Sequence, residues 1–364
     1  MELYPVKAEA VMYRIKYKKI IYKGDSIMTN DIIDPGLVPQ RVLRGGDKMP
    51  GIGMGTFGSD RFTAEDIAAA VKGAAEVGFR LFDCAAVYGN EHLIGEVFED
   101  IMKSGIKREE LFITSKVWND MHGKGDVMLS CAKTLKDLRL DYIDLYFVHW
   151  PFRNFHPKGA APDYHNKDAK PFSIEQYMET WYQMERLQKA GYVKHIGASN
   201  MTVPKLKELF KHATIMPAAI EMELHPCFQQ PELFQFALDH GIQPIGFCPI
   251  GSPTRPDRDK TAEDYVDIQE PVIVEIAKAH NVHPAVICVK WAVQRGQTPI
   301  PFSIHRNEYA SNLRCAVEDP LTEEEMKKIE GVDKNCRLIK GQVFLWDGAK
   351  DWTDLWDLNG DITK

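Results

Sequence analysis

Four ionisable side chains of four different types stand at or just after the ends of three apolar runs in the sequence. A tyrosine among them could donate a proton, but its unperturbed pKa near 10 is too high for efficient donation at neutral pH. A lysine cation beside it would lower that pKa, an aspartate would keep the lysine charged, and a neutral histidine could orient a carbonyl group. We therefore expect a centre that protonates a carbonyl oxygen as hydride reaches its carbon. The four residues are Asp83, Tyr88, Lys116 and His149.

These residues can meet only if their strands lie side by side in the same direction. From residue 50 onward, eight short apolar runs alternate with amphipathic helical patterns, which predicts parallel strands joined by right-handed crossovers. A closed (β/α)8 TIM barrel fits this α/β alternation and the 364 residues better than an open doubly wound sheet. Active sites of such barrels lie at the C-terminal ends of the strands. The predicted strands cover residues 51–56, 80–85, 111–117, 143–149, 193–199, 217–224, 242–249 and 298–302.

Local signals define further elements. Thr63 predicts the start of a helix over residues 63–77. The tight-turn sequence Gly45-Gly46-Asp47 predicts an N-terminal hairpin that covers the barrel floor. The glycines of residues 51–55 superficially resemble a dinucleotide fingerprint. They lie within the first strand rather than on a turn that opens a helix, so a Rossmann domain is not favoured.

The composition excludes several classes of protein. Lys plus Arg number 45 against 52 Asp plus Glu, a net charge of −7, so the chain offers no general basic face to nucleic acid. Hydrophobic residues at 44% are typical of a packed domain, and no run of about 18 apolar residues could span a membrane. Seven cysteines without a C-x-x-C pair indicate free thiols and a cytoplasmic protein.

The N-terminal end differs from the predicted barrel. Residues 1–23 carry a local charge of +4, which fits an amphipathic membrane arm, a transit peptide, or an upstream extension before Met28. We expect residues 1–37 to form a poorly ordered extension and residues 38–364 to form the barrel with its C-terminal loop.

Five ordered motifs add a further signal. They are FDCAAVYGNE at residues 82–91, Lys116, HWP at 149–151, IGASN at 196–200 and ELHP at 223–226. Together they resemble the aldo-keto reductase family, from about Val38 to the C-terminus. The resemblance implies a (β/α)8 barrel, a nicotinamide cofactor bound without a Rossmann domain, and a tetrad of the four residues above. It also implies reduction of an aldehyde or ketone to an alcohol, with Tyr88 as the general acid.

The resemblance assigns a cofactor site as well. Ser199 and Asn200 match a pair that binds the nicotinamide carboxamide, and Phe247 falls where an aromatic ring stacks on the nicotinamide. The other residues assigned to the cofactor are Gly55, Thr56, Glu221, Cys248, Pro249, Gly251, Ser252, Phe302, Ser303, Glu308 and Asn312.

Four positions depart from the family pattern. Phe247 stands where the family usually carries a Tyr, so it keeps the ring face and loses the hydroxyl. Glu221 replaces the usual Gln at the carboxamide and is an acceptor only, unless protonated. Phe302 and Glu308 stand where NADPH-preferring members carry a Lys and an Arg for the 2′-phosphate. A carboxylate repels a phosphate but accepts a hydrogen bond from a ribose 2′-hydroxyl. We expect NAD(H) to be the preferred cofactor, with NADP(H) left open through His305 or Arg306.

Two segments exceed ordinary loop lengths, residues 151–171 and the tail 338–364. The tail either packs across the barrel or also forms a lid over a substrate pocket. Phe57, Trp118 and Trp150 are the predicted wall of that pocket. With polar additions from the first segment, it would accept a carbonyl compound bearing hydroxyls, such as an aldose, and hydrophobic carbonyl compounds are the alternative. We expect a monomer or a weak dimer.

Two other classes of function compete. Metal-dependent barrel hydrolases gather His and carboxylates on the same rim, and Asp83, His149, Glu223 and His225 could form a ligand set. Lys116 beside such a set would repel a cation, so we expect no metal. Some barrels of this family act as nicotinamide-sensing regulatory subunits, and the intact tetrad favours an enzyme instead.

Overall fold

The computed structural model describes residues 31–364, except residues 59, 154–156, 158–159, 162, 254 and 256–259. Asp31–Lys364 forms one compact unit. The unit begins before residue 38, because Ile33 is buried and its N–H donates to the carbonyl of Val77 at 2.8 Å. The predictions made for residues 1–30 lie outside the described residues.

The barrel is built as predicted, from parallel strands that neighbour one another in sequence order from β3 to β10. It closes between the first and last strands, where Gly53 and Gly55 donate to the carbonyls of Pro299 and Pro301, both at 3.0 Å. Glycine is needed there, because a Cβ on Gly55 would lie 2.9 Å from the carbonyl oxygen of Ile300. The strands are β3 (Met54–Gly55), β4 (Leu81–Asp83), β5 (Phe112–Val117), β6 (Ile143–Val148), β7 (Val193–Ser199), β8 (Ala219–Glu223), β9 (Gln243–Phe247) and β10 (Thr298–Pro299).

A hairpin covers the N-terminal end of the barrel, as the sequence predicted. Its strands β1 (Gln40–Val42) and β2 (Lys48–Pro50) pair antiparallel. Leu43 and Met49 from this hairpin belong to the same buried cluster as Leu145 from β6. The hairpin is therefore held against the bottom of the barrel by apolar contacts.

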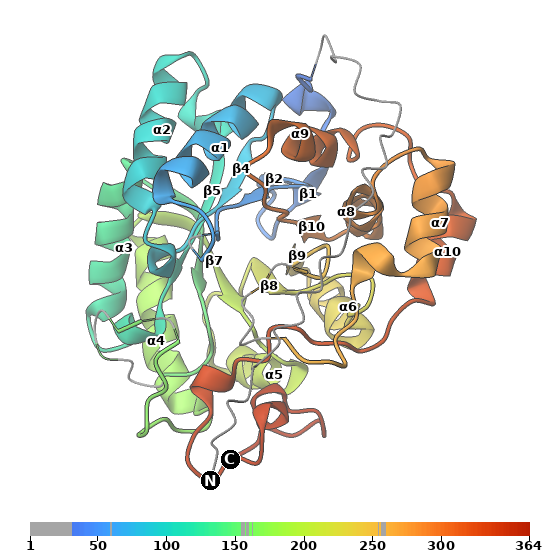
Figure 1. Ribbon diagram of the computed structural model, residues 1–364. Helices are drawn as coiled ribbons and strands as arrows, with labels where there is room; N and C mark the ends of the chain where they lie inside the picture. The colour runs from blue at the N-terminus through green and yellow to red at the C-terminus, as the bar shows by residue number, and fades with distance from the viewer. Residues whose placement is uncertain are drawn as a thin grey trace, which may run out of the picture. The chain divides into compact units, whose positions relative to one another are not determined.

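Helices surround the barrel (Figure 1). A capping box starts the first one, since Thr63 accepts from the backbone N–H of Asp66 and the Asp66 carboxylate accepts from that of Thr63. Among the described residues, no single helix is long and apolar enough to cross a membrane, and only the bent pair α7 and α8 passes that test jointly, by length and composition. The helices are α1 (Ala64–Val77), α2 (Glu91–Lys103), α3 (Asp126–Leu138), α4 (Ile174–Lys189), α5 (Val203–His212), α6 (Pro231–Asp239), α7 (Pro271–Ala279), α8 (Pro284–Arg295), α9 (Arg306–Arg314) and α10 (Glu323–Glu330).

The C-terminal tail packs on the barrel. In Figure 1 it is the red segment that runs beside α5. The Lys205 ammonium in α5 pairs with the Asp357 carboxylate and donates to the carbonyl of Leu355 at 2.9 Å. Both charged side chains are buried, and breaking a buried pair leaves an uncompensated charge. The end of the tail is thereby fixed to the helix that follows β7.

Candidate active site

Lys116 is the electrostatic centre of the rim. Its Nζ donates to both carboxylate oxygens of Asp83, at 2.7 and 2.6 Å, and to the carbonyl of Cys84 at 3.1 Å. Glu221 Oε1 lies 3.4 Å from the same nitrogen. Burial alone would lower the pKa of Lys116, but Asp83 and Glu221 raise it well above its usual value. The lysine is therefore a permanent cation held between two carboxyl groups.

Tyr88 lies between this cation and His149. Lys116 Nζ is 5.4 Å from the centre of the Tyr88 ring, and the His149 ring meets it edge-on at 5.8 Å. We expected Lys116 to lower the Tyr88 pKa, and this is wrong for the net shift. Burial raises the pKa well above its usual value, and Asp83 and Glu221 oppose the lowering by Lys116. The resting side chain is a neutral phenol with its proton in place.

His149 is neutral at neutral pH, as the acid–base scheme requires. Burial and the Lys116 cation, with His122 in addition, lower its pKa well below the usual value. The Trp118 ring meets it edge-on at 5.1 Å, and the Asn200 side-chain amide donates to its backbone carbonyl at 2.9 Å. These contacts hold the ring against Tyr88.

Glu221 favours its protonated form, the case that the sequence left open. Burial, with Asp83 nearby, raises the pKa of Glu221 to about 8, although Lys116 opposes the rise. A neutral carboxyl group donates one hydrogen bond and accepts another, as the Gln amide of the family pattern does. Of the two cases that the sequence left open for Glu221, the raised pKa favours the protonated one, in which the group both donates and accepts.

Three buried polar atoms, one on Glu221 itself and two on neighbouring residues, have no hydrogen-bond partner among the described residues. A nicotinamide carboxamide needs an acceptor for its NH2 and a donor for its carbonyl, and such a set can supply both. Unpaired buried polar atoms are costly, which indicates that a polar ligand group completes them. The atoms are Ser199 Oγ, Asn200 Oδ1 and Glu221 Oε2.

A cavity of about 320 Å³ opens at this rim. Most of the predicted site residues line it: Gly55, Thr56, Phe57, Asp83, Tyr88, Trp118, His149, Trp150, Asn200, Glu221, Phe247, Cys248, Pro249, Ser252 and Phe302. The other predicted residues lie outside its lining, and they are Lys116, Ser199, Gly251, Ser303, Glu308 and Asn312.

Part of the cavity wall comes from the tail. Phe344 packs on Trp150 with ring centres 4.6 Å apart and on Trp118 at 6.0 Å. The length of the tail signalled a lid, but no local pattern showed which residues face the cavity. The lining residues that the sequence did not indicate are Asp60, Arg61, Val87, Asp163, Ile250, Pro253, Arg255, Ile300, Pro301, Ile339, Gly341, Gln342, Val343 and Phe344.

Two charged side chains in the segment after β10, those of Glu308 and Arg306, are engaged in contacts within the chain. The Ser303 hydroxyl donates to Glu308 Oε2 at 2.6 Å. Arg306 is engaged elsewhere, because its guanidinium pairs with Asp31 at 2.6 Å and with Glu76 at 3.1 Å. Of the two residues that left NADP(H) open, Arg306 is therefore held by two carboxylates.

The alternative metal site is not assembled. Glu223 and His225 pair with each other at 3.1 Å and line no part of the rim cavity. No group of three or more His, Cys, Asp or Glu residues among those described is placed to hold a metal ion.

The fold and site together define a (β/α)8 barrel in which four ionisable side chains meet at the C-terminal ends of the strands. Residues 51–334 match the model of the Aldo/keto reductase family. Aldo-keto reductase family 1 member A1 of Xenopus tropicalis is 39% identical over 83% of this chain and 91% of its own length. The human protein of the same name is 37% identical over 82% and 90%.

A solved structure agrees with these relatives. The aldose reductase from Schistosoma japonicum superposes with a TM-score of 0.75 at 30% identity, covering 86% of this chain and 98% of its own. The chain belongs to the aldo/keto reductase family, and it is an oxidoreductase that uses a nicotinamide cofactor on small-molecule carbonyl substrates.

Proposed function

We propose that the chain reduces an aldehyde or ketone to an alcohol, with Tyr88 as the proton donor and NADH as the preferred cofactor. The observation that carries this proposal is the meeting of Tyr88 and His149 with the Lys116–Asp83 pair at one cavity. The wall of the same cavity offers Asn200 and Glu221 to a carboxamide.

Each rim residue then has a distinct task. The bound nicotinamide supplies hydride. The neutral imidazole of His149 orients the carbonyl oxygen of the substrate. As hydride arrives, that oxygen becomes an alkoxide, a stronger base than a phenolate, so the Tyr88 phenol can give it a proton despite its raised pKa. Lys116 stabilises the phenolate that remains, and its two bonds to Asp83 keep the ammonium in place. The aromatic rings of the wall exclude water, which strengthens these electrostatic effects.

The proposed NADH preference rests on the segment after β10. Glu308 presents a carboxylate on the first turn of α9, and Phe302 lines the cavity in the place of a cation. The guanidinium of Arg306 is already shared between Asp31 and Glu76. Kinetics with both cofactors test this proposal, and a kcat/KM that favours NADPH by about tenfold or more would overturn it.

The substrate class depends on the cavity wall. Phe57, Trp118, Trp150, Val343 and Phe344 make it largely apolar and aromatic, which favours a carbonyl compound with an apolar or aromatic substituent. Asp163 and Gln342, two of the polar residues in the same lining, favour the hydroxylated alternative, an aldose. A reductase screen over sugar aldehydes, keto sugars and aromatic aldehydes decides between them. Cofactor binding without turnover across the screen would instead favour a regulatory subunit.

A further inference from the structure

Glu223, His225 and Asp267 form a buried chain of charges that the proposed reaction does not use. His225 Nε2 lies 3.1 Å from Glu223 Oε1, and its Nδ1 lies 3.0 Å from Asp267 Oδ1. None of the three side chains has exposed surface. Burial alone would lower the pKa of His225, but Asp267 and Glu223 raise it to about 9, so the ring is a cation at neutral pH.

One end of this chain holds the start of the tail. Glu223 Oε1 accepts the backbone N–H of Leu338 at 2.7 Å, and Oε2 accepts that of Ile339 at 2.9 Å. Ile339 lines the rim cavity, and Val343 and Phe344 follow it in the same wall. The position of the proposed substrate wall is therefore set by the two oxygens of Glu223.

The other end abuts the loop after β9. Asp267 Oδ1 also accepts the backbone N–H of Cys227 at 2.9 Å, while Oδ2 has no hydrogen-bond partner among the described residues. A Cβ on Gly251 would lie 2.0 Å from that oxygen, so the loop packs directly on the carboxylate. Cys248 and Ser252 of this loop line the cavity on the side assigned to the cofactor.

We propose that Glu223, His225 and Asp267 act as a rim clamp, which positions residues 248–253 and residues 338–344 against each other so that cofactor binding orders the substrate wall. This inference rests on the proposed cofactor site. One imidazolium is shared by two carboxylates, and each carboxylate contacts a different loop. A movement of either loop therefore shifts a carboxylate that pairs with His225, and such coupling acts equally in both directions.

Amide hydrogen exchange of the wild-type protein is the first test. Peptides that cover residues 248–253 and 338–344 are followed with and without NADH. We expect NADH to slow exchange in both segments. Slowing in residues 248–253 alone would overturn the clamp and leave the cofactor proposal standing. Slowing in neither segment would overturn both.

The variant Glu223→Gln is the second test, because it keeps the shape of the side chain and turns one acceptor toward the tail into a donor. We expect NADH to slow exchange only in residues 248–253 of this variant. The KM for an aldehyde should rise about tenfold, while the single-turnover rate at saturation changes less than about threefold. Slowing in both segments, or a lower single-turnover rate at unchanged KM, would overturn the clamp.

A matched control separates positioning from general loss of stability. Glu185 is equally a buried carboxylate that accepts two backbone N–H groups, from Thr214 at 2.7 Å and Ile215 at 2.9 Å. Those residues precede β8, away from the rim. Glu185→Gln should lower thermal stability and leave the KM and the NADH response of residues 338–344 unchanged. A KM rise in this variant equal to that of Glu223→Gln would overturn the assignment.

Discussion

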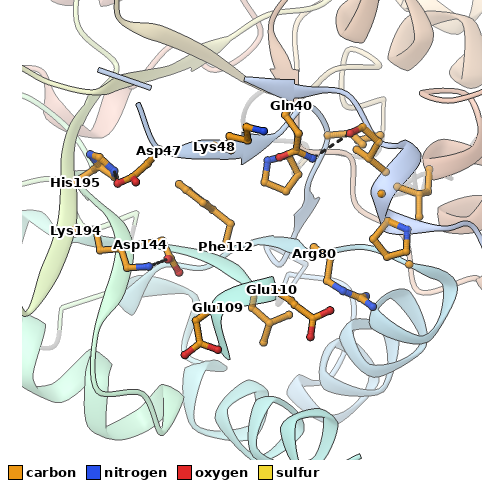
Figure 2. A pocket seen from close by; sticks show the side chains of 18 residues that line it. Gln40, Asp47, Lys48, Arg80, Glu109, Glu110, Phe112, Asp144, Lys194 and His195 are labelled. Carbon is orange, nitrogen blue, oxygen red and sulfur yellow. Dashed lines mark hydrogen bonds and ion pairs between the residues drawn. The ribbon is translucent and has the colours of Figure 1, made fainter. Parts of the chain in front are cut away.

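The two ends of the barrel carry cavities of similar size and different character. The floor cavity measures about 410 Å³ and the rim cavity about 320 Å³. Figure 2 shows the floor cavity, in which Asp47 pairs with His195 and Lys194 pairs with Asp144. These contacts measure 2.8 and 3.2 Å, so these four side chains are partnered within the floor.

Among the residues that line the floor cavity, one buried polar atom lacks a partner in the described part of the chain, Arg80 Nε. The same guanidinium donates from Nη1 to the carbonyls of Ala75 and Phe79, at 3.0 and 2.9 Å, so its charge is already well solvated by backbone. At the rim three unpaired atoms belong to Glu221, which lies beside the Lys116 cation, and to its neighbours Ser199 and Asn200. By volume alone, the floor cavity would have been chosen as the candidate active site. The rim cavity is chosen instead, because it combines unpaired buried polar atoms with groups whose pKa values are shifted.

The largest expected difference between the two ends comes from Tyr88→Phe. It removes the phenolic proton from the rim and keeps the ring, so turnover should fall about a thousandfold, within the usual range for loss of a general acid. NADH binding, measured by quenching of protein fluorescence, should persist.

The matched control is Tyr142→Phe near the floor, where the ring lies under the Arg108 guanidinium at 3.9 Å. This variant should keep full turnover. Retained activity in Tyr88→Phe, or a comparable loss in Tyr142→Phe, would contradict the assignment of the acid.

A smaller effect is expected from the cofactor end of the rim. Combining Phe302→Lys with Glu308→Arg supplies two cations for a 2′-phosphate, and the ratio of kcat/KM for NADPH over NADH should rise at least about tenfold. The control Glu318→Arg adds a cation beyond α9, at a residue outside the cavity lining, and should leave the ratio unchanged. An unchanged ratio in the double variant would show that these positions do not select the cofactor.

The proton on Glu221 predicts a pH dependence of stability. Its pKa of about 8 in the folded chain lies above the usual value near 4.3, so the folded state binds the extra proton between these values. Stability from this group is complete at low pH and is lost as the pH rises toward 8. Between these two pKa values, one proton bound only by the folded chain makes the free energy of unfolding fall by about 1.4 kcal/mol per pH unit.

Glu221→Gln should remove that slope. Urea unfolding at pH 5.5, 6.5 and 7.5 would then show the free energy of unfolding of the variant rising against wild type by roughly 1 kcal/mol per pH unit. Parallel curves for the two proteins would mean that Glu221 is already ionised.

The strands and the four rim residues could be predicted because each follows from the pattern of a short stretch of sequence. Short β-branched runs alternate with helical patterns, and parallel strands in a closed barrel bring Asp83, Lys116 and His149 to one end. The hairpin at the floor followed equally from its turn sequence.

The remaining features depend on contacts between distant segments. Phe344 reaches Trp150 only because the tail folds back over the rim, which no periodicity shows. The Tyr88 pKa was predicted in the wrong direction because the sequence pointed to Lys116 but not to burial of the phenol. Glu221 keeps its proton for the same reason, since Asp83 from β4 shares its cation.

The smallest expected effect is at the floor. Asp47→Asn leaves an acceptor oxygen for His195 and removes one charge from a pair whose carboxylate is exposed, which is worth at most about 1 kcal/mol. Turnover, KM and NADH binding should match wild type, because the change lies at the opposite end of the strands from Tyr88. A change of more than about threefold in kcat/KM would show that the floor cavity is coupled to the rim. The contrast between a structural floor and a functional rim would then be wrong.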